Sequence, residues 1–364
     1  MPRVLLVTQP TDGGVFRHVR DLAEGLPALG FDVALAAPPL TTSAPAGTVV
    51  RLPLVRAPSP GADARALSGL VRAVRALRPD IVHAHSSKAG AVARLARLPA
   101  PRIPVVYTPH GYAHAGYFES RAQRRAYGLI ERTLTPLASR VVCVCEAERR
   151  LALDLGAGGR ARVVYNGIGP PADTPVLPEV AAMRDRGPVI ATVSLLRPGK
   201  GIETLLDALP EVLSVHAGAQ LAIAGTGVDR ERLEGRARAL GVAKAVRFLG
   251  FVSDTAALLR GADIFVSSSW AESFPYVVLD AMALSRPIVA TRVGGVAEAV
   301  RDGESGLLVA PGDAETLAKA IGRLLSDPAR AAELGAAARS RVTTRFTRGR
   351  MLEDLAAVYS DLLA

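Results

Sequence analysis

Two carboxylates flank the start of a predicted helix in the sequence Ser-Trp-Ala-Glu272-Ser-Phe-Pro-Tyr-Val-Val-Leu-Asp280. An apolar strand is predicted just before them, over residues 262–266, and Pro275 favours a helix start because its missing N–H would have no partner in a first turn. A helix N-terminus attracts anions, phosphates above all, and carboxylates accept hydrogen bonds from sugar or ribose hydroxyls. The stretch therefore indicates a ligand with phosphate and hydroxyl groups. An acidic helix start with one exposed aspartate explains these residues equally well.

Two cations flank a glycine turn after another predicted strand, residues 189–193. The segment is Arg197-Pro-Gly-Lys200-Gly201, and a helix is predicted directly after it, over 202–209. Arginine as a planar fork, lysine as a point charge and glycine for close backbone approach can together bind a diphosphate. The spacing differs from that of a P-loop, so a nucleotide hydrolase is not predicted. Solvated loop charges are the structural alternative.

Histidines stand at the ends of predicted strands in the first half of the chain. His83 and His85 lie in Val-His-Ala-His, and His110 lies in Thr-Pro-His-Gly beside a glycine turn. An imidazole at such a place can donate a hydrogen bond or move a proton, although His110 alone fits a turn histidine bonded to backbone. His83 and His85 share a strand face, but the sequence offers no third ligand, so no metal site is predicted.

Glycine pairs occur twice near predicted strand ends. Gly13-Gly14 follows the first strand and lets the backbone approach a ligand closely. Gly225-Thr-Gly227 has Arg230 where a dinucleotide fingerprint would have its third glycine, and tight-turn glycines explain it better. A nicotinamide-dependent enzyme is therefore not predicted.

Apolar strand-like runs alternate with helical patterns along the whole chain, which predicts an α/β fold with parallel, doubly wound sheets. Strands are expected at 4–7, 33–36, 81–85, 105–108, 141–145 and 163–165, and then at 189–193, 220–224, 246–248, 264–266, 288–290 and 307–309. Helices in the first half are expected at 15–29, 64–77, 89–98 and 120–137. A Pro-rich break suggests a domain over 1–170, a linker over 171–187, a domain over 188–349 and an amphipathic last helix at about 350–364.

Composition limits the compartment and the partners. The 364 residues suffice for two domains, and no apolar run is long enough to span a bilayer or to form a signal peptide, so a cytoplasmic protein is expected. Cys143 and Cys145 alternate along an apolar strand and are expected to be reduced core thiols.

The net charge of +10 is unevenly placed. Residues 1–187 carry 24 Lys and Arg against 14 Asp and Glu, which accounts for all of it. Aromatic residues make up only 4%, so nucleic acid is not a predicted partner. Arg121, Arg124, Arg125 and Arg132 follow a helical spacing suited to docking on anionic lipid. A solvated helix face and a general bias toward arginine are the alternatives.

The order of these motifs resembles retaining glycosyltransferases of family 4, which have the GT-B fold. Gly13-Gly14, His83-x-His85, Thr-Pro-His110-Gly, Asn166-Gly167, Arg197-x-x-Lys200-Gly, Glu272-x7-Asp280 and Gly294-Gly295 follow one another as in that family. The resemblance implies two Rossmann-like domains facing each other across a cleft, with the last helix crossing back to the first domain. It also implies that the acceptor binds mainly to the N-terminal half and the nucleotide-sugar to the C-terminal half.

The resemblance further implies roles for individual residues. The expected catalytic set is His110, Arg197, Lys200 and Glu272; the donor contacts also include Gly14, Phe251, Val252, Ser273, Phe274, Tyr276 and Asp280; His18, His85, Arg121, Arg124 and Arg125 are expected to bind the acceptor or face a membrane. No cofactor and no metal are expected, because the nucleotide-sugar is a substrate. Two departures from the family are Asp280 in place of the usual glutamate and Pro275 in place of a common glycine.

The implied reaction moves a hexose-type sugar, with retention, from a nucleoside diphosphate (UDP favoured) to an acceptor hydroxyl. A lipid-linked saccharide at the inner membrane face is the favoured acceptor, in polysaccharide or glycoconjugate biosynthesis. Glycosylation of a small soluble natural product, a GT-B sugar-nucleotide epimerase and a non-catalytic glycan- or membrane-binding relative are the alternatives.

Overall fold

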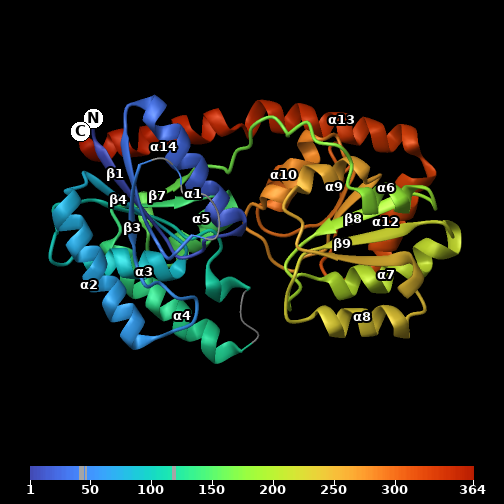
Figure 1. Ribbon diagram of the computed structural model, residues 1–364, viewed down its shortest axis with the longest axis horizontal. Coiled ribbons are helices and arrows are strands. Elements are labelled where there is room, and N and C mark those ends of the chain that lie inside the picture. Colours follow the sequence, from blue (N-terminus) through green and yellow to red (C-terminus); the bar gives the residue numbers. More distant parts are fainter. Residues whose placement is uncertain (41–44, 46, 117–119) are drawn as a thin grey trace. The chain divides into compact units, whose positions relative to one another are not determined.

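The computed structural model describes all residues except 41–44, 46 and 117–119. The described chain forms two compact units (Figure 1). Unit 1 comprises residues 1–166 together with 348–364, and unit 2 comprises residues 167–347. Unit 1 is therefore built from two separate stretches of sequence.

Unit 1 contains a seven-stranded sheet in the order β3-β2-β1-β4-β5-β6-β7, and every neighbouring pair is parallel. The strands are β1 (Arg3–Thr8), β2 (Asp32–Ala37), β3 (Thr48–Arg51), β4 (Ile81–His85), β5 (Val105–Thr108), β6 (Arg140–Cys143) and β7 (Ala161–Val163). Residues 4–7 at the centre are completely buried, as expected for a parallel strand covered on both faces. The carboxyl ends of β1, β4 and β5 carry polar side chains.

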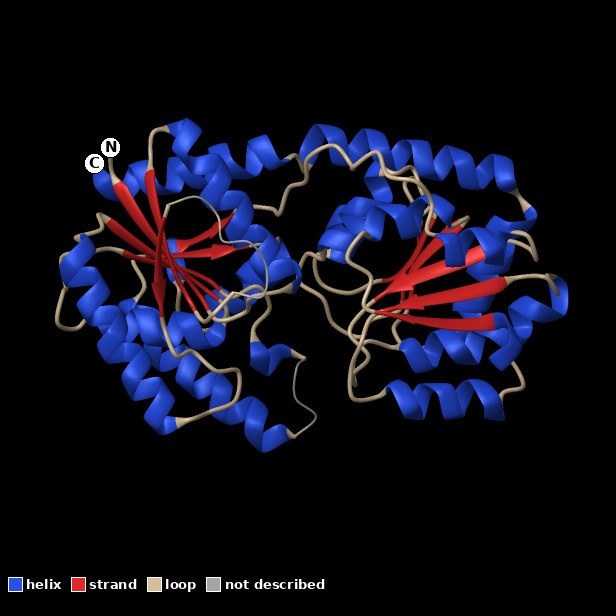
Figure 2. Cartoon of the chain, in the orientation of Figure 1, coloured by secondary structure: helices blue, strands red, loops and turns tan. Residues whose placement is uncertain are grey.

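Helices cover both faces of this sheet (Figure 2). They are α1 (Gly13–Gly25), α2 (Pro60–Leu77), α3 (Ser87–Ala96), α4 (Arg121–Leu134), α5 (Glu146–Asp154) and α14 (Arg348–Leu363). The last of them, α14, lies beside α1 (Figure 1) and buries Met351, Leu355 and Tyr359 in the same core as Val19 and Leu22. The C-terminal helix thus completes the core of unit 1.

Unit 2 contains a six-stranded parallel sheet in the order β10-β9-β8-β11-β12-β13. The strands are β8 (Val189–Val193), β9 (Gln220–Ala224), β10 (Val246–Gly250), β11 (Ile264–Ser267), β12 (Ile288–Thr291) and β13 (Leu307–Val309). The helices are α6 (Pro178–Arg184), α7 (Ile202–Val215), α8 (Arg230–Ala239), α9 (Thr255–Gly261), α10 (Tyr276–Ala283), α11 (Val296–Ala299), α12 (Ala314–Ser326) and α13 (Pro328–Arg345). The predicted α/β class with two doubly wound units is confirmed.

Several elements differ from the sequence-based expectations. Residues 178–184, which were expected to be linker, form α6, because Val180 and Met183 pack into the core of unit 2. The helix expected over 15–29 ends at Gly25 and continues as a short 3-10 turn to Leu29. The strand expected over 141–145 ends at Cys143, and Cys145 caps α5 by accepting a hydrogen bond from the Glu148 N–H. Both cysteines are buried free thiols.

Among the described residues, none of the helices has both the length and the apolar composition needed to span a bilayer.

Candidate functional site

In unit 2, the cation and the carboxylate predicted to bind the nucleotide-sugar donor contact each other directly. Lys200 Nζ lies 2.6 Å from Glu272 Oε1, and the Ser269 hydroxyl donates to the same oxygen at 2.7 Å. Lys200 and Glu272 are 15% and 17% exposed, so the pair is partly shielded but still reached by solvent. Both loops follow carboxyl ends of strands, β8 and β11, which is where ligands bind in such sheets. The structure thus brings the two predicted groups together.

Two glycines allow the backbone of these loops to meet. Gly201 has φ +64°, and a Cβ at this position would lie 1.9 Å from the Ser268 carbonyl oxygen. Gly294 has φ +41°, and its Cβ would lie 1.8 Å from the Glu272 carbonyl oxygen. Any larger residue would therefore clash with backbone and adopt a disfavoured conformation. The glycines fix where Lys200 and Glu272 stand.

Other residues predicted to bind the donor lie at α10 and after β10 in unit 2. Phe274 and Tyr276 are buried at the start of α10, and Asp280 lies on the same helix, partly exposed. Pro275 is the N-cap of α10, one position before the helix, so it removes no hydrogen bond from it. Phe251 follows β10 and is 76% exposed, which leaves its ring face open for stacking, whereas Val252 packs against core residues of unit 2.

Arg197 is partly buried in the loop before α7, and Nη1 donates to the Pro198 carbonyl oxygen at 3.3 Å. Ser273 lies next to Glu272 and is also partly buried. Gly14, in contrast, belongs to unit 1, where it forms the exposed first turn of α1. It follows Gly13, whose φ of +66° lets the chain enter the helix.

Unit 1 brings three histidines together at the carboxyl ends of β4 and β5. His85 ends β4, His110 follows β5, and His18 lies on α1. His85 Nδ1 and His110 Nε2 are 3.1 Å apart, and the rings of His18 and His110 meet edge to face, with centroids separated by 4.7 Å. His18 and His85 are buried, and His110 is partly exposed. Burial of this kind contradicts a membrane-facing role for His18 and His85, while acceptor binding stays a prediction for both.

Burial also keeps these imidazoles neutral. Desolvation lowers the pKa of His18 to about 4, although a hydrogen bond with the Asn166 side chain partly offsets this effect. Desolvation, reinforced by neighbouring imidazoles, holds the pKa values of His85 and His110 well below their usual range. A neutral ring has one N–H and one lone pair, so each can donate one hydrogen bond and accept another.

A fourth histidine connects this group to the C-terminal helix. His83 Nδ1 lies 2.6 Å from the Tyr359 hydroxyl, and His83 Nε2 lies 2.8 Å from the Thr108 hydroxyl. The His83 ring packs against that of His85, with centroids separated by 4.0 Å. The sequence reveals the Val-His-Ala-His pattern but not its partner, because Tyr359 is 276 residues away.

Glu148 holds the turn that carries His110. The buried carboxylate accepts from the Gly111 N–H at 2.5 Å and from the Val144 N–H at 2.8 Å. His110 itself has φ +54°, a conformation that non-glycine residues seldom adopt. The glutamate thus stabilises a strained backbone at a predicted site residue. Only its place in an α5 first turn, Glu146-Ala-Glu148, could have drawn attention to it.

The arginines predicted to face a membrane lie on one helix of unit 1. Arg121, Arg124 and Arg125 are exposed on α4, and the same helix exposes Leu129 and Ile130. Glu131 is the buried residue of α4; it pairs with Arg94 at 2.9 Å and accepts from the Tyr107 hydroxyl at 2.9 Å. The helix is therefore anchored to the core by a buried ionic group.

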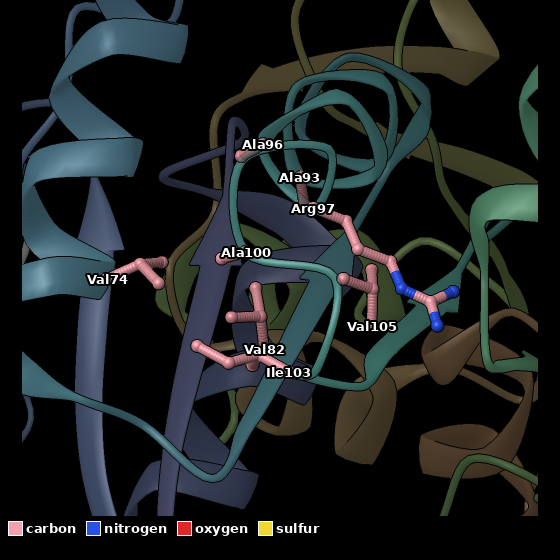
Figure 3. Close-up of a pocket in the computed structure, with 8 residues that line it drawn as sticks. All are labelled: Val74, Val82, Ala93, Ala96, Arg97, Ala100, Ile103 and Val105. Atoms are coloured by element: carbon pink, nitrogen blue, oxygen red, sulfur yellow. The ribbon is translucent and has the colours of Figure 1, made fainter.

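A small pocket elsewhere in unit 1 is lined almost entirely by apolar side chains (Figure 3). Its only charged residue, Arg97, directs Nη1 to the Leu137 carbonyl oxygen at 2.8 Å. It contains none of the predicted site residues, and its lining offers no acid, base or nucleophile. We therefore assign no chemistry to it.

Comparisons with known proteins identify glycosyltransferases along almost the whole chain. Residues 12–170 match the model described as Glycosyltransferase Family 4, and residues 173–341 match the model described as Glycosyl transferases group 1. D-inositol 3-phosphate glycosyltransferase of Acidothermus cellulolyticus is 34% identical, over 97% of this chain and 86% of the relative.

Two solved structures share the fold over nearly all of both chains. Sucrose-phosphate synthase from Thermosynechococcus elongatus aligns with a TM-score of 0.86 and 25% identity, over 100% of this chain and 99% of the other. Anabaena Alr3699/HepE in complex with UDP-glucose aligns with a TM-score of 0.82 and 22% identity, over 99% and 100%.

Proposed function

The chain belongs to glycosyltransferase family 4, and from this premise we propose that it transfers a hexose-type sugar with retention from UDP to an acceptor hydroxyl. The observation that carries the proposal is the contact of 2.6 Å between Lys200 and Glu272 beside the start of α7. A cation and a carboxylate held together in this way match a ligand with a diphosphate at one end and sugar hydroxyls at the other.

The proposed mechanism needs charge stabilisation where the sugar–phosphate bond breaks. Cleavage builds negative charge on the β-phosphate, and in this proposal Arg197, Lys200 and the N-terminus of α7 would stabilise that charge. Lys200 would then leave Glu272 for the phosphate, and Glu272 would accept hydrogen bonds from the sugar. These cations supply the positive charge themselves, so we propose that transfer proceeds without a metal ion.

The contacts to the base, the ribose and the sugar of the donor are assigned from the exposure and chemistry of individual side chains. Phe251 offers an exposed ring for the base, with Val252 beside it, and Asp280 offers a carboxylate for the ribose hydroxyls. Backbone groups of Ser273, Phe274 and Tyr276 would contact the sugar. UDP is the first nucleotide to test because a neighbour with the same fold binds UDP-glucose. His110 is proposed as the catalytic contact from unit 1.

The acceptor is proposed to bind unit 1 and to be anionic. Residues 1–187 carry the whole net charge of +10, and α4 exposes three arginines next to Leu129 and Ile130. A lipid-linked saccharide on an anionic membrane suits this helix. A small soluble acceptor is the second candidate, since a relative with 34% identity is named for D-inositol 3-phosphate.

Vesicle binding separates the two acceptors. We expect sedimentation with anionic vesicles that is lost at high salt and in the combined Arg121→Gln, Arg124→Gln and Arg125→Gln variant. Equal binding to neutral vesicles, or none at low salt, would leave the soluble acceptor as the better proposal.

The first test is calorimetric titration of UDP, GDP and ADP in EDTA, with the unaltered protein and Lys200→Ala. We expect UDP to bind without metal and the substitution to weaken binding by about 10-fold to 100-fold, the usual effect of one charged contact. Lys244→Ala, which alters a lysine outside the site, serves as the control and should bind normally. Failure of all three nucleotides to bind would contradict the proposal and favour a non-catalytic relative. Conversion of a UDP-sugar without any acceptor would favour an epimerase.

A further inference from the structure

The three histidines of unit 1 come from separate elements and converge on a small volume. His18 belongs to α1, His85 ends β4 and His110 follows β5. Each ring offers one nitrogen, and these three nitrogens all lie within 4.8 Å of one another. Three imidazoles this close are a ligand set that divalent transition metals such as zinc favour.

One nitrogen in this group lacks a partner. His85 is completely buried, and its Nε2 has no hydrogen-bond partner among the described residues. A buried polar atom left in this state costs free energy, and in native proteins it usually has a water, an ion or a ligand beside it. The neighbouring backbone is also strained, with φ +79° at Ser86 and φ +54° at His110. The unpartnered nitrogen shows that the described residues alone do not satisfy this cluster.

We propose that His18, His85 and His110 form a binding site for a divalent transition metal ion, with Zn²⁺ as the reference. In a tetrahedral zinc site with bonds of about 2.05 Å, two ligand nitrogens stand about 3.3 Å apart. The 3.1 Å between His85 Nδ1 and His110 Nε2 is close to this separation. Each ring would bind through a lone pair. Ligation through His85 Nδ1 would put the proton of this ring on Nε2, the nitrogen without a described partner, where a water would accept it.

The ring orientations are supported from outside the group. His18 hydrogen-bonds the Asn166 side chain, and His85 packs against His83, which is itself held at both nitrogens. A hydrogen-bonding partner such as Asn166 fixes ring orientation in known metal sites. The cluster contains no carboxylate, which disfavours calcium and magnesium, since both prefer oxygen ligands. Three protein ligands would leave a fourth position open for water or a substrate oxygen.

The consequence for transfer rests on the proposed function, which uses His110 as a contact in the reaction. An ion bound to His110 would occupy the lone pair that the reaction needs. We therefore expect Zn²⁺ to inhibit transfer at least about 10-fold at saturation, and EDTA to restore it.

The test reads metal binding directly, with no substrate present. The full chain is freed of metal with EDTA and titrated with Co²⁺, whose visible absorption becomes intense in a tetrahedral site. We expect one ion per chain, displaced by Zn²⁺. The variants His85→Ala and His110→Ala should each lose the absorption, and His216→Ala, in unit 2, should keep it. Circular dichroism and the unfolding midpoint establish that each variant is folded.

Two results would overturn the inference: no tetrahedral Co²⁺ absorption in the unaltered protein, or the same absorption in folded His110→Ala. The partly exposed His110 provides a second variant in case His85→Ala does not fold. The outcomes also separate the two proposals. Metal binding without any sugar transfer would contradict only the proposed function, and transfer in EDTA by a protein that binds no metal would contradict only the metal site.

Discussion

The Lys200–Glu272 pair of unit 2 is charged and stands on loops, whereas the histidine cluster of unit 1 consists of neutral, largely buried imidazoles at helix and strand ends. In unit 2, Lys200 and Glu272 keep their places because glycines let the backbone of neighbouring loops come close. In unit 1, His83, His85 and His110 are held by one another and by side chains of the core. One group depends on backbone shape and charge, and the other on burial and hydrogen bonds.

This difference predicts which substitutions and which changes of pH should disturb each unit. The charged pair depends on close backbone contacts at two glycines, so an added methyl group at either should disrupt it. Buried neutral imidazoles depend instead on pH and on the hydrogen bonds around them. The four predictions below test this contrast, beginning with the largest expected effect.

Gly294→Ala should abolish the arrangement in unit 2. Its Cβ would meet the Glu272 carbonyl oxygen at 1.8 Å, so the Glu272 loop must move. We expect transfer to fall about 1,000-fold, the upper range for losing preorganised charge stabilisation. The measurement is the rate of sugar transfer together with UDP affinity. Gly303→Ala is the matched control, because Gly303 also has positive φ (+72°) but has nothing within 4 Å of an added Cβ. Equal losses in both variants would show that strain alone, and not the position of Glu272, matters.

Glu272→Gln should break the charged pair while preserving its shape. The amide still accepts a hydrogen bond but no longer neutralises Lys200. We expect transfer to fall about 100-fold, whereas UDP binding should hold or strengthen because Lys200 becomes free for phosphate. Calorimetry and steady-state rates measure the two effects separately. The exposed Glu304→Gln is the control. Parallel loss of binding and transfer would contradict the assignment of Glu272 to the sugar.

Tyr359→Phe tests how far a hydrogen bond to the buried histidines stabilises unit 1. It removes the hydroxyl 2.6 Å from His83 Nδ1 and leaves that buried nitrogen without its partner. We expect the free energy of unfolding to fall by about 1–3 kcal/mol, measured by urea denaturation. Ser360→Ala, on the exposed side of the same helix, should change it by less than about 0.5 kcal/mol. An unchanged midpoint in Tyr359→Phe would show that His83 finds another partner.

Acid should destabilise unit 1 before carboxylates titrate. The pKa of His18 is lowered to about 4 in the folded chain against 6.5 for the ordinary group, so the unfolded chain binds more protons between these values. Stability is therefore fully present above pH 6.5 and declines as the pH falls toward 4. His18 alone should cost about 1.4 kcal/mol at pH 5.5. Urea denaturation at pH 7.5 and 5.5 measures this, and His18→Gln should reduce the pH dependence. A pH dependence that is the same in both proteins would contradict the neutral state of His18.

The sequence predicts elements well wherever apolar runs are buried on both faces. The strands of both sheet centres, such as 4–7 and 189–193, are of this kind. Sequence patterns fail where the apolar run is short or the packing partner is distant. β3 is an exposed edge strand with only two adjacent apolar residues, Val49 and Val50, and α6 packs into the core although its range has the composition of a Pro-rich linker. Boundaries also shift where a helix ends in a 3-10 turn, as after Gly25.

The candidate residues are visible in the sequence as types, but their contacts are not. Spacing indicates that Lys200 and Glu272 follow strands, yet the 2.6 Å contact depends on the fold that joins positions 72 residues apart. The expectation of no third metal ligand was made from neighbours in sequence. In the structure, His18 and His110 from other elements lie beside His85, which is the basis of the metal site proposed above. Apart from the place of Glu148 in the first turn of α5, the sequence does not reveal the roles of Glu148 and Tyr359, because their partners are backbone amides or lie far along the chain.

Unit 1 is interrupted by the whole of unit 2, and this has a consequence for how the protein is made. A ribosome delivers residues 1–166 first, then all of unit 2, and only then α14. Until that last helix emerges, the apolar surface that receives Met351 and Leu355 has no cover, and His83 lacks the Tyr359 hydroxyl. Unit 2 is continuous in sequence and can fold while synthesis proceeds. A nascent chain that stops before α14 would therefore carry a folded unit 2 and an incomplete unit 1, whose open apolar surface is the kind that cellular quality control recognises.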